Sequence, residues 1–133
     1  MKYLSEIMEH RQSKLFKEKK VFFAFSNKQF KEGVEKHKLT KENKMVKMGG
    51  GMFCPSGNVK EVIDQMDLIY KESIIEDMKQ GKEKVILREL GNHECFYTGD
   101  YSDCINKLED YPIKKSEIKE VFYKNYQAEC SKF

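Results

Sequence analysis

The segment richest in side chains that could do chemistry is Arg88–Cys95, which reads Arg-Glu-Leu-Gly-Asn-His-Glu-Cys. Glu89 and His93 are four residues apart, so on a helix they face the same side. A carboxylate and an imidazole placed in this way could form half of a metal site or an oriented base. If the protein is an enzyme, we expect His93 to be the general base, with Glu89 or Glu94 orienting it.

The same segment also has a structural interpretation, which its spacing favours. The zinc-protease pattern H-E-x-x-H requires a second histidine, and none follows His93 at that spacing. A structural zinc ion needs four ligands, and the cysteines of the chain could join His93 only if the fold assembled them. We therefore predict no metal ion and no cofactor. We expect His93 to be a structural residue that is paired with Glu89 or buried against Tyr97.

A second candidate site is the glycine triplet Gly49-Gly50-Gly51. A phosphate-binding glycine loop leads from a strand into a helix, often with a lysine after the glycines. Here the triplet is followed by Met52-Phe53-Cys54-Pro55, which is typical of another strand. We therefore predict a hairpin turn, and the alternative is close approach of the backbone to a ligand.

If the protein binds a small ligand or a nucleotide, the glycine turn and the histidine segment are expected to line one pocket, with Tyr97 stacking on a base. The predicted ligand-binding residues are Gly49, Gly50, Gly51, Asn92, His93, Glu94, Tyr97 and Asp100. Asp100 and Asp103 lie beside Thr98 and Ser102, and helix capping explains them without catalysis. No serine lies in a G-x-S-x-G motif, and no cysteine lies in a nucleophile signature.

The composition is that of a small globular protein. The chain has 133 residues, of which 39% are hydrophobic and 35% are charged, with 9 Phe, 7 Tyr and 7 Met. No apolar run is long enough to cross a bilayer, and the amphipathic start lacks the apolar stretch of a signal peptide. We therefore predict a cytoplasmic protein that does not enter the membrane. Its four cysteines, none in a C-x-x-C pair, are expected to be reduced thiols.

The net charge of +3 is unevenly distributed along the chain. Residues 1–48 carry 13 Lys/Arg against 6 Asp/Glu, whereas residues 49–112 carry 7 against 13. A basic first third could contact phosphate. However, Arg11 and Arg88 are the chain's only arginines, and recognition of guanine and phosphate favours arginine. The sequence therefore argues against nucleic acid as the partner. The complementary charges allow self-association as an alternative.

The periodicity predicts an α+β fold, a mainly helical single globular domain over residues 1–133 with a small antiparallel sheet or hairpin. Ser26 and Gln29 form a capping-box pattern, Asn58 and Gly81 bound the strongest helix, and Ser102 and Ser116 are expected N-caps. Helices are expected at 3–17, 26–35, 59–80, 86–97, 102–109 and 116–126, strands at 21–25, 45–48 and 52–54, and a polar loop at 37–44.

The aromatic residues Phe22, Phe23, Phe25 and Phe30 are expected to lie in the core. The lysines at 14, 17, 19 and 20 are expected to be a solvated helix end, where positive charge suits the helix dipole, or to meet an acidic partner.

Three segments together resemble a known family. They are residues 21–30 with Glu32-Gly33, residues 48–52 with Pro55, and residues 88–94 running into Tyr97-Thr98-Gly99-Asp100. In this order they are similar to an uncharacterised family of small proteins encoded by bacteriophages and prophages. The resemblance covers about two-thirds of the chain and implies a viral accessory role in the bacterial cytoplasm.

On this basis the leading hypothesis is a non-enzymatic phage accessory protein that binds a host protein. The partner is expected to be part of a defence system, such as a nuclease complex, which the protein would inhibit in the manner of an anti-CRISPR protein or another counter-defence factor. The acidic middle of the chain could compete with nucleic acid for a basic groove. The alternatives are a small-ligand or nucleotide-binding protein that sequesters its ligand, and a small enzyme that uses His93 as its general base.

Overall fold

The computed structural model describes residues 1–40 and 42–131, and Lys41, Lys132 and Phe133 lie outside the described residues. The chain divides into two compact units, an N-terminal unit of Lys2–Ser73 and a C-terminal unit of Ile74–Phe133, with Met1 grouped with the latter. The mainly helical α+β class is confirmed, and the single domain over residues 1–133 stays a prediction. The elements are α1 (Leu4–Glu18), β1 (Phe22–Phe23), α2 (Asn27–Lys36), β2 (Met45–Gly49), β3 (Met52–Pro55), the 3-10 helix η1 (Ser56–Asn58), α3 (Val59–Met78), α4 (Lys82–Asn92), α5 (Cys95–Thr98), α6 (Ser102–Lys107) and α7 (Lys115–Cys130).

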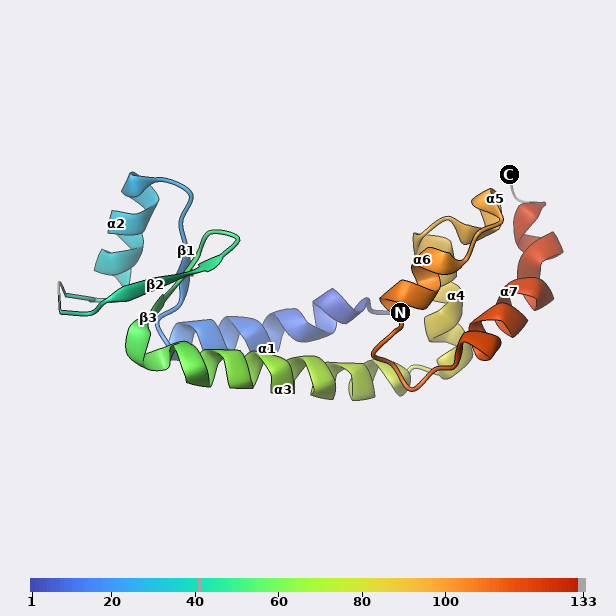
Figure 1. Ribbon diagram of the computed structural model, residues 1–133, viewed down its shortest axis with the longest axis horizontal. Coiled ribbons are helices and arrows are strands. Elements are labelled where there is room, and N and C mark those ends of the chain that lie inside the picture. Colours follow the sequence, from blue (N-terminus) through green and yellow to red (C-terminus); the bar gives the residue numbers. More distant parts are fainter. Residues whose placement is uncertain (41, 132–133) are drawn as a thin grey trace. The chain divides into compact units, whose positions relative to one another are not determined.

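The N-terminal unit is built on the predicted three-stranded antiparallel sheet, with strand order β1-β3-β2 (Figure 1). Phe22 pairs with Phe53, and β2 and β3 form the hairpin. One face of the sheet buries Val21 and Met52 with residues of α1 and α3, and the other buries Phe22 with residues of α2. This alternation is the two-residue period of a strand.

The glycine triplet forms the predicted hairpin turn. Gly49 pairs with Met52, so Gly50 and Gly51 are the two loop residues, and their φ angles are +58° and +79°. Positive φ at both central residues is what a type I′ hairpin turn requires, and glycine adopts it without steric cost. The ring of Phe25 occupies the space that a Cβ atom on Gly51 would need, with a carbon 2.4 Å from that position.

Helices α1 and α2 end in the same motif, with lysine where glycine is usual. Lys20 follows α1 and Lys38 follows α2, with φ angles of 59° and 55°. The next N–H groups, of Val21 and Leu39, donate to carbonyls five residues back at 2.8 and 2.9 Å. These bonds and the left-handed residue before them define the Schellman motif, in which that residue is most often glycine.

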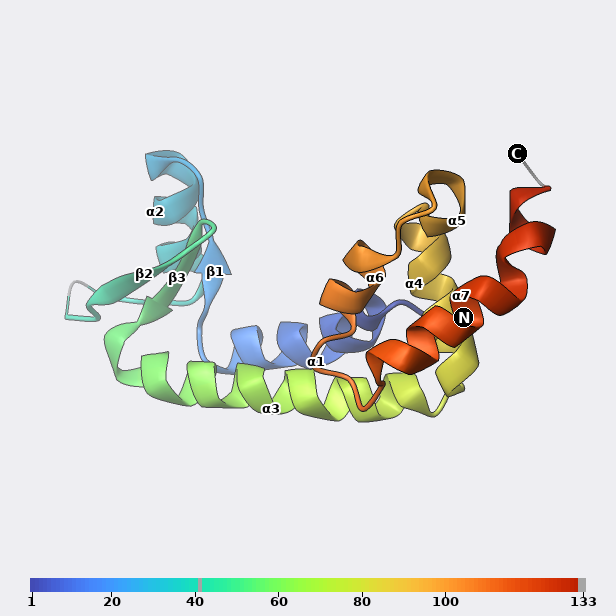
Figure 2. The same ribbon diagram turned by 45° about the vertical axis from the view of Figure 1, so that its right-hand side comes forward.

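Figure 2 shows the helices α4 to α7 of the C-terminal unit. Their core buries Leu90, Cys95, Cys104 and Ile118 together with Phe122. The Phe122 ring stacks on Phe96, with ring centroids 5.3 Å apart. All four cysteines of the chain are free thiols, as predicted, and three of them are buried. Burial raises the pKa of the Cys104 thiol to about 12, so this thiol is protonated at neutral pH.

Four predicted helix features are wrong. Ser102 is not an N-cap, because it is the first residue of α6 and the Asp100 carboxylate accepts its N–H. Asn58 does not cap α3, because it belongs to η1 and its side chain donates to the Lys19 carbonyl. The helix expected to run unbroken over 86–97 ends at Asn92, because Glu94 takes a left-handed conformation with φ of 53° before α5 begins. Ser116 does not cap the last helix, since α7 already begins at Lys115 and the Glu117 carboxylate accepts the Lys114 N–H. Ser26 does cap α2 by accepting the Gln29 N–H, but the Gln29 side chain accepts the N–H of Phe25, one residue before the N-cap, so only half of the predicted capping box forms.

The prediction of a core role for the aromatic residues near β1 is half wrong. Phe22 is buried and Phe30 is half-buried, but the side chains of Phe23 and Phe25 are 51% and 76% exposed. The expected strand 21–25 is only two residues long. Phe23 follows Phe22 on β1 and so faces the opposite side from the ring that packs on α2, and Phe25 lies beyond the strand, in the bend before α2.

Candidate functional site

The segment that the sequence singled out lies in the C-terminal unit, where it forms a buried ionic network. The Arg88 guanidinium donates two hydrogen bonds to the Asp77 carboxylate, at 2.7 and 2.8 Å, and its Nε donates to Glu89 at 2.9 Å. The Tyr111 hydroxyl donates to Asp77 Oδ2 at 2.6 Å. The side chains of Asp77, Arg88 and Glu89 are 0%, 6% and 2% exposed. Such groups are compatible with burial only when paired in this way.

The electrostatics of this network follow from the pairing. Burial alone would raise the pKa of Asp77, but hydrogen bonds from Arg88 and Tyr111 and the Arg88 charge leave that pKa below its usual value. Burial would lower the pKa of Arg88, yet its bonds to Asp77 and Glu89 raise that pKa above its usual value. Burial and the Asp77 carboxylate both raise the pKa of Tyr111. The groups therefore hold each other in their charged or donating forms.

His93 lies at the end of this network rather than in an open site. It is the C-cap of α4, and its Nε2 lies 3.5 Å from Glu89 Oε2, on the side that the four-residue spacing predicts. Both atoms are buried without a hydrogen-bond partner among the described residues. A group of three or more metal-ligating side chains does not occur in the part of the chain that the structure describes. These contacts join α3 to α4. A catalytic role for His93, Glu89 or Glu94 stays a prediction.

The other predicted ligand-binding residues are separated between the two units. Gly49, Gly50 and Gly51 belong to the N-terminal unit, and Asn92, Glu94, Tyr97 and Asp100 belong to the C-terminal unit. Asn92, Glu94 and Tyr97 are exposed. Asp100 Oδ1 accepts the Ser102 N–H at 2.9 Å, which lowers the pKa of Asp100 and is the capping contact expected from the sequence. One pocket lined by all of these residues stays a prediction.

A basic groove of about 1070 Å³ lies within the N-terminal unit, beside the free edge of β1. Its positive groups surround the ends of α1 and α2, and its apolar lining is aromatic. The basic residues are Lys17, Lys20, Lys36, His37 and Lys38, the aromatic residues are Phe16, Phe22 and Phe23, and the acidic residue is Glu32.

The four lysines of the basic groove are exposed and, among the described residues, none of them forms an ion pair. Each of the two helix ends contributes a partial negative charge of about −0.5. Four lysines, Glu32 and these two ends leave a local charge of about +2. Compensation of the helix dipoles therefore accounts for only part of the positive charge, and the rest is available to an anion.

His37 lies in the basic groove, and its pKa depends in part on the positive charges around it. Its ring stacks on Phe22, with centroids 5.8 Å apart. Burial lowers the pKa of His37, and the positive charges of Lys36 and Lys20 lower this pKa further. Because Lys20 follows α1 and Lys36 belongs to α2, the two helix ends act on the same small volume.

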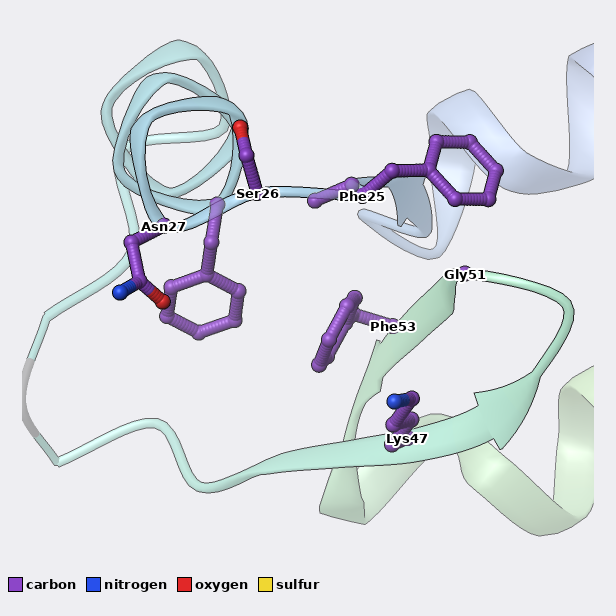
Figure 3. Close-up of a pocket in the computed structure, with 8 residues that line it drawn as sticks. Phe25, Ser26, Asn27, Lys47, Gly51 and Phe53 are labelled. Carbon is purple, nitrogen blue, oxygen red and sulfur yellow. The ribbon is translucent and has the colours of Figure 1, made fainter.

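A second hollow, of about 510 Å³, opens on the other side of the β1–α2 turn. Figure 3 shows Phe25 above the Gly51 end of the hairpin, with Phe53 and Lys47 below and Asn27 on the α2 side. The Phe30 and Phe53 rings meet edge to face, with centroids 4.9 Å apart. This hollow is mainly aromatic, and Lys47 is the basic residue that lines it.

Sequence reasoning missed the basic groove because its residues come from separate elements. Two signals were nevertheless present. Lysine follows two predicted helices at positions where glycine normally ends a helix, and the apolar run at 21–25 places three phenylalanines, at 22, 23 and 25, next to them. The pairing of the two helix ends is a tertiary contact that neither signal encodes.

The fold and groove define a class: small α+β proteins with a basic, aromatic-lined groove at the edge of a three-stranded sheet. The chain belongs to a family of unknown function, DUF7659, whose model matches residues 4–132. No curated protein and no solved structure matches the chain. Membership of an uncharacterised family is thus confirmed, and a bacteriophage origin stays a prediction. No helix in the described part of the chain is long and apolar enough to span a membrane.

Proposed function

We propose that the protein acts by binding, and that the basic groove of the N-terminal unit binds a ligand that carries several phosphate groups. The observation that supports this most directly is the convergence of Lys17, Lys20, Lys36 and Lys38, without ion pairs among the described residues, on one groove. Lysine is a flexible point charge with three donors, which suits phosphates presented at varying angles.

The alternative explanation of these lysines is that they keep the protein soluble and protect the β1 edge from pairing with another chain. Charges that serve only this purpose are distributed over a surface rather than gathered in a groove. Two observations support the binding role. The charges of Lys20 and Lys36 act together on His37 inside the groove, and residues 2–73 carry a formal charge of +5 against −2 for residues 74–133. Concave surfaces lined by charge of one sign raise the local concentration of a ligand of opposite sign.

Binding of inorganic tripolyphosphate tests the proposal. We expect binding measured by isothermal titration calorimetry at low salt, and a loss of at least tenfold when Lys17, Lys20, Lys36 and Lys38 are changed together to Gln. The matched control changes Lys28, Lys31, Lys60 and Lys79 to Gln, which removes the same charge from exposed positions outside the groove. Equal losses in both variants would mean that the net charge matters and the groove does not.

Inhibition of a bacterial defence system is the second candidate, and the resemblance to phage-encoded proteins is what favours it. In this proposal the protein binds a host protein in the bacterial cytoplasm, and exposed apolar side chains such as Ile63 and Leu68 of α3 are available for such a contact. Affinity purification of the tagged protein from a host with defined defence systems tests it. Failure to retain a stoichiometric host protein would contradict the inhibitor proposal.

Self-association is a separate alternative, and size-exclusion chromatography of the pure protein tests it.

A further inference from the structure

Exposed aromatic residues on and just after β1 distinguish the basic groove from a simple anion site. Phe23, the last residue of β1, lines the groove, and Phe25, in the bend before α2, lines the hollow of Figure 3. Their side chains are 51% and 76% exposed. Phosphate recognition requires no aromatic ring, so exposed rings beside the lysines of the groove favour a ligand with flat faces of its own.

We propose that the β1 edge binds single-stranded nucleic acid, an inference that rests on the proposed function. The phosphates would contact the four lysines of the basic groove, and successive bases would stack on Phe23 and Phe25. A base stacked on Phe25 would direct the strand toward Lys47, the basic residue of the second hollow. Positive grooves combined with aromatic platforms are the common arrangement for binding single strands without sequence preference.

The geometry favours a single strand over a duplex and over a free nucleotide. In a duplex the bases are stacked on each other, so their faces cannot reach Phe23 or Phe25. A single nucleotide brings one base, whereas the edge offers two rings and the groove alone measures about 1070 Å³. Pockets for small ligands are typically about 300–1,000 Å³, so this groove is at the upper limit of that range.

The low arginine content does not contradict this ligand. Arginine is preferred for reading guanine in the major groove and for bidentate phosphate contacts. Binding that follows the backbone and stacks on bases reads no sequence, and lysine provides the required charge. The scarcity of arginine therefore disfavours sequence-specific recognition, and it does not disfavour binding of a single strand at β1.

The test uses fluorescence polarisation of a labelled oligothymidine of about 15 nucleotides, the upper end of what one small domain covers. Four lysine contacts predict a slope of about −2.8 in log affinity against log salt, so affinity should fall about 50-fold between 50 and 200 mM salt. Changing the four groove lysines to Gln should bring this slope close to zero. The control variant at Lys28, Lys31, Lys60 and Lys79 should retain most of it.

The aromatic contribution is tested with Phe23→Leu and Phe25→Leu, which remove the ring and keep an apolar side chain. Stacking of one base predicts a loss of about 5-fold or more for each variant, with unchanged thermal melting and unchanged tripolyphosphate binding. The matched control is Tyr123→Leu, which removes an exposed ring from the C-terminal unit.

The outcomes separate this inference from the proposed function. If tripolyphosphate binds but the oligonucleotide binds no better than an equal charge of polyphosphate, the single-strand inference is overturned and the phosphate proposal stands. Tighter binding of the matching duplex, or loss in Tyr123→Leu but not in the phenylalanine variants, also overturns it. If neither probe binds, both proposals fail.

Discussion

The two units use charge in opposite ways. In the C-terminal unit, Arg88 is buried and its donors are directed to Asp77 and Glu89. In the N-terminal unit, lysines such as Lys20 and Lys38 are exposed at a groove and, among the described residues, have no acidic partner. A buried charge that is fully paired holds elements together, whereas an exposed, unpaired group in a concave surface can bind a partner. The comparison therefore assigns stability to one set and binding to the other.

The largest effect that tests this comparison is expected from Arg88→Ala. The substitution leaves Asp77 and Glu89 buried without their cation, and breaking a buried pair in this way costs about 3–5 kcal/mol. Urea unfolding followed by circular dichroism measures the change, and Lys84→Ala is the control because Lys84 is exposed in the same helix. A loss below about 1 kcal/mol would show that the network does not hold the unit together.

Acid should weaken the same network, with a smaller effect. The pKa of Asp77 is lower in the folded protein than its ordinary value of 3.8, so the ionised carboxylate stabilises the fold above that value. This stabilisation is lost as the pH falls through the lower folded pKa. We expect unfolding free energy measured between about pH 5 and 2 to fall with acid, and Asp77→Asn to reduce that slope. An unchanged slope in the variant would assign acid sensitivity to other carboxylates.

The groove lysines allow stability and binding to be separated. Lys20→Gly and Lys38→Gly place glycine at left-handed positions, where a side chain is strained by roughly 1 kcal/mol. Each variant should therefore raise the free energy of unfolding by about 0.5–1 kcal/mol, since part of the gain is lost to the greater freedom of glycine in the unfolded chain. Thermal melting measures this change.

The same two variants should weaken binding of tripolyphosphate. A protein that becomes more stable and binds less tightly would show that lysine is kept at these positions for the ligand. If the variants become more stable but bind tripolyphosphate equally well, Lys20 and Lys38 do not take part in binding. The proposed binding role of the groove then fails at these two residues.

Sequence patterns predicted what depends on neighbouring residues. The N-cap at Ser26, the glycine hairpin and the long α3 all follow from local periodicity and turn chemistry, and they are confirmed. Errors arise where tertiary packing decides. Glycine inside a helix is normally a cost, but the Phe22 ring lies 2.3 Å from where a Cβ atom on Gly33 would be, so that position must be glycine for α2 to pack on the sheet.

The candidate site was harder to predict for the same reason. The sequence ranked the Arg88–Glu94 segment first because its residue types are those of catalytic sites, but burial and pairing of Arg88 depend on Asp77 and Tyr111, which are distant in sequence. Conversely, the lysines at the end of α1 were predicted to be a solvated helix end and Lys38 part of a polar loop, and only the fold brings Lys20 near His37. Residue type identified chemistry, and the fold determined whether that chemistry is available.

The smallest effect, and the most local one, is expected at His37. The positive charges of Lys36 and Lys20 help to keep the pKa of His37 low, so an anion bound in the groove should raise that pKa by offsetting their field. NMR titration of the His37 ring, with and without tripolyphosphate, measures the shift. By linkage, binding should strengthen as the pH falls through this range, because the protonated ring adds a positive charge to the groove. The ring signals of His93, in the other unit, are the internal control and should not move when tripolyphosphate is added. Movement of the His93 signals with none at His37 would reverse the comparison and place the binding site in the C-terminal unit.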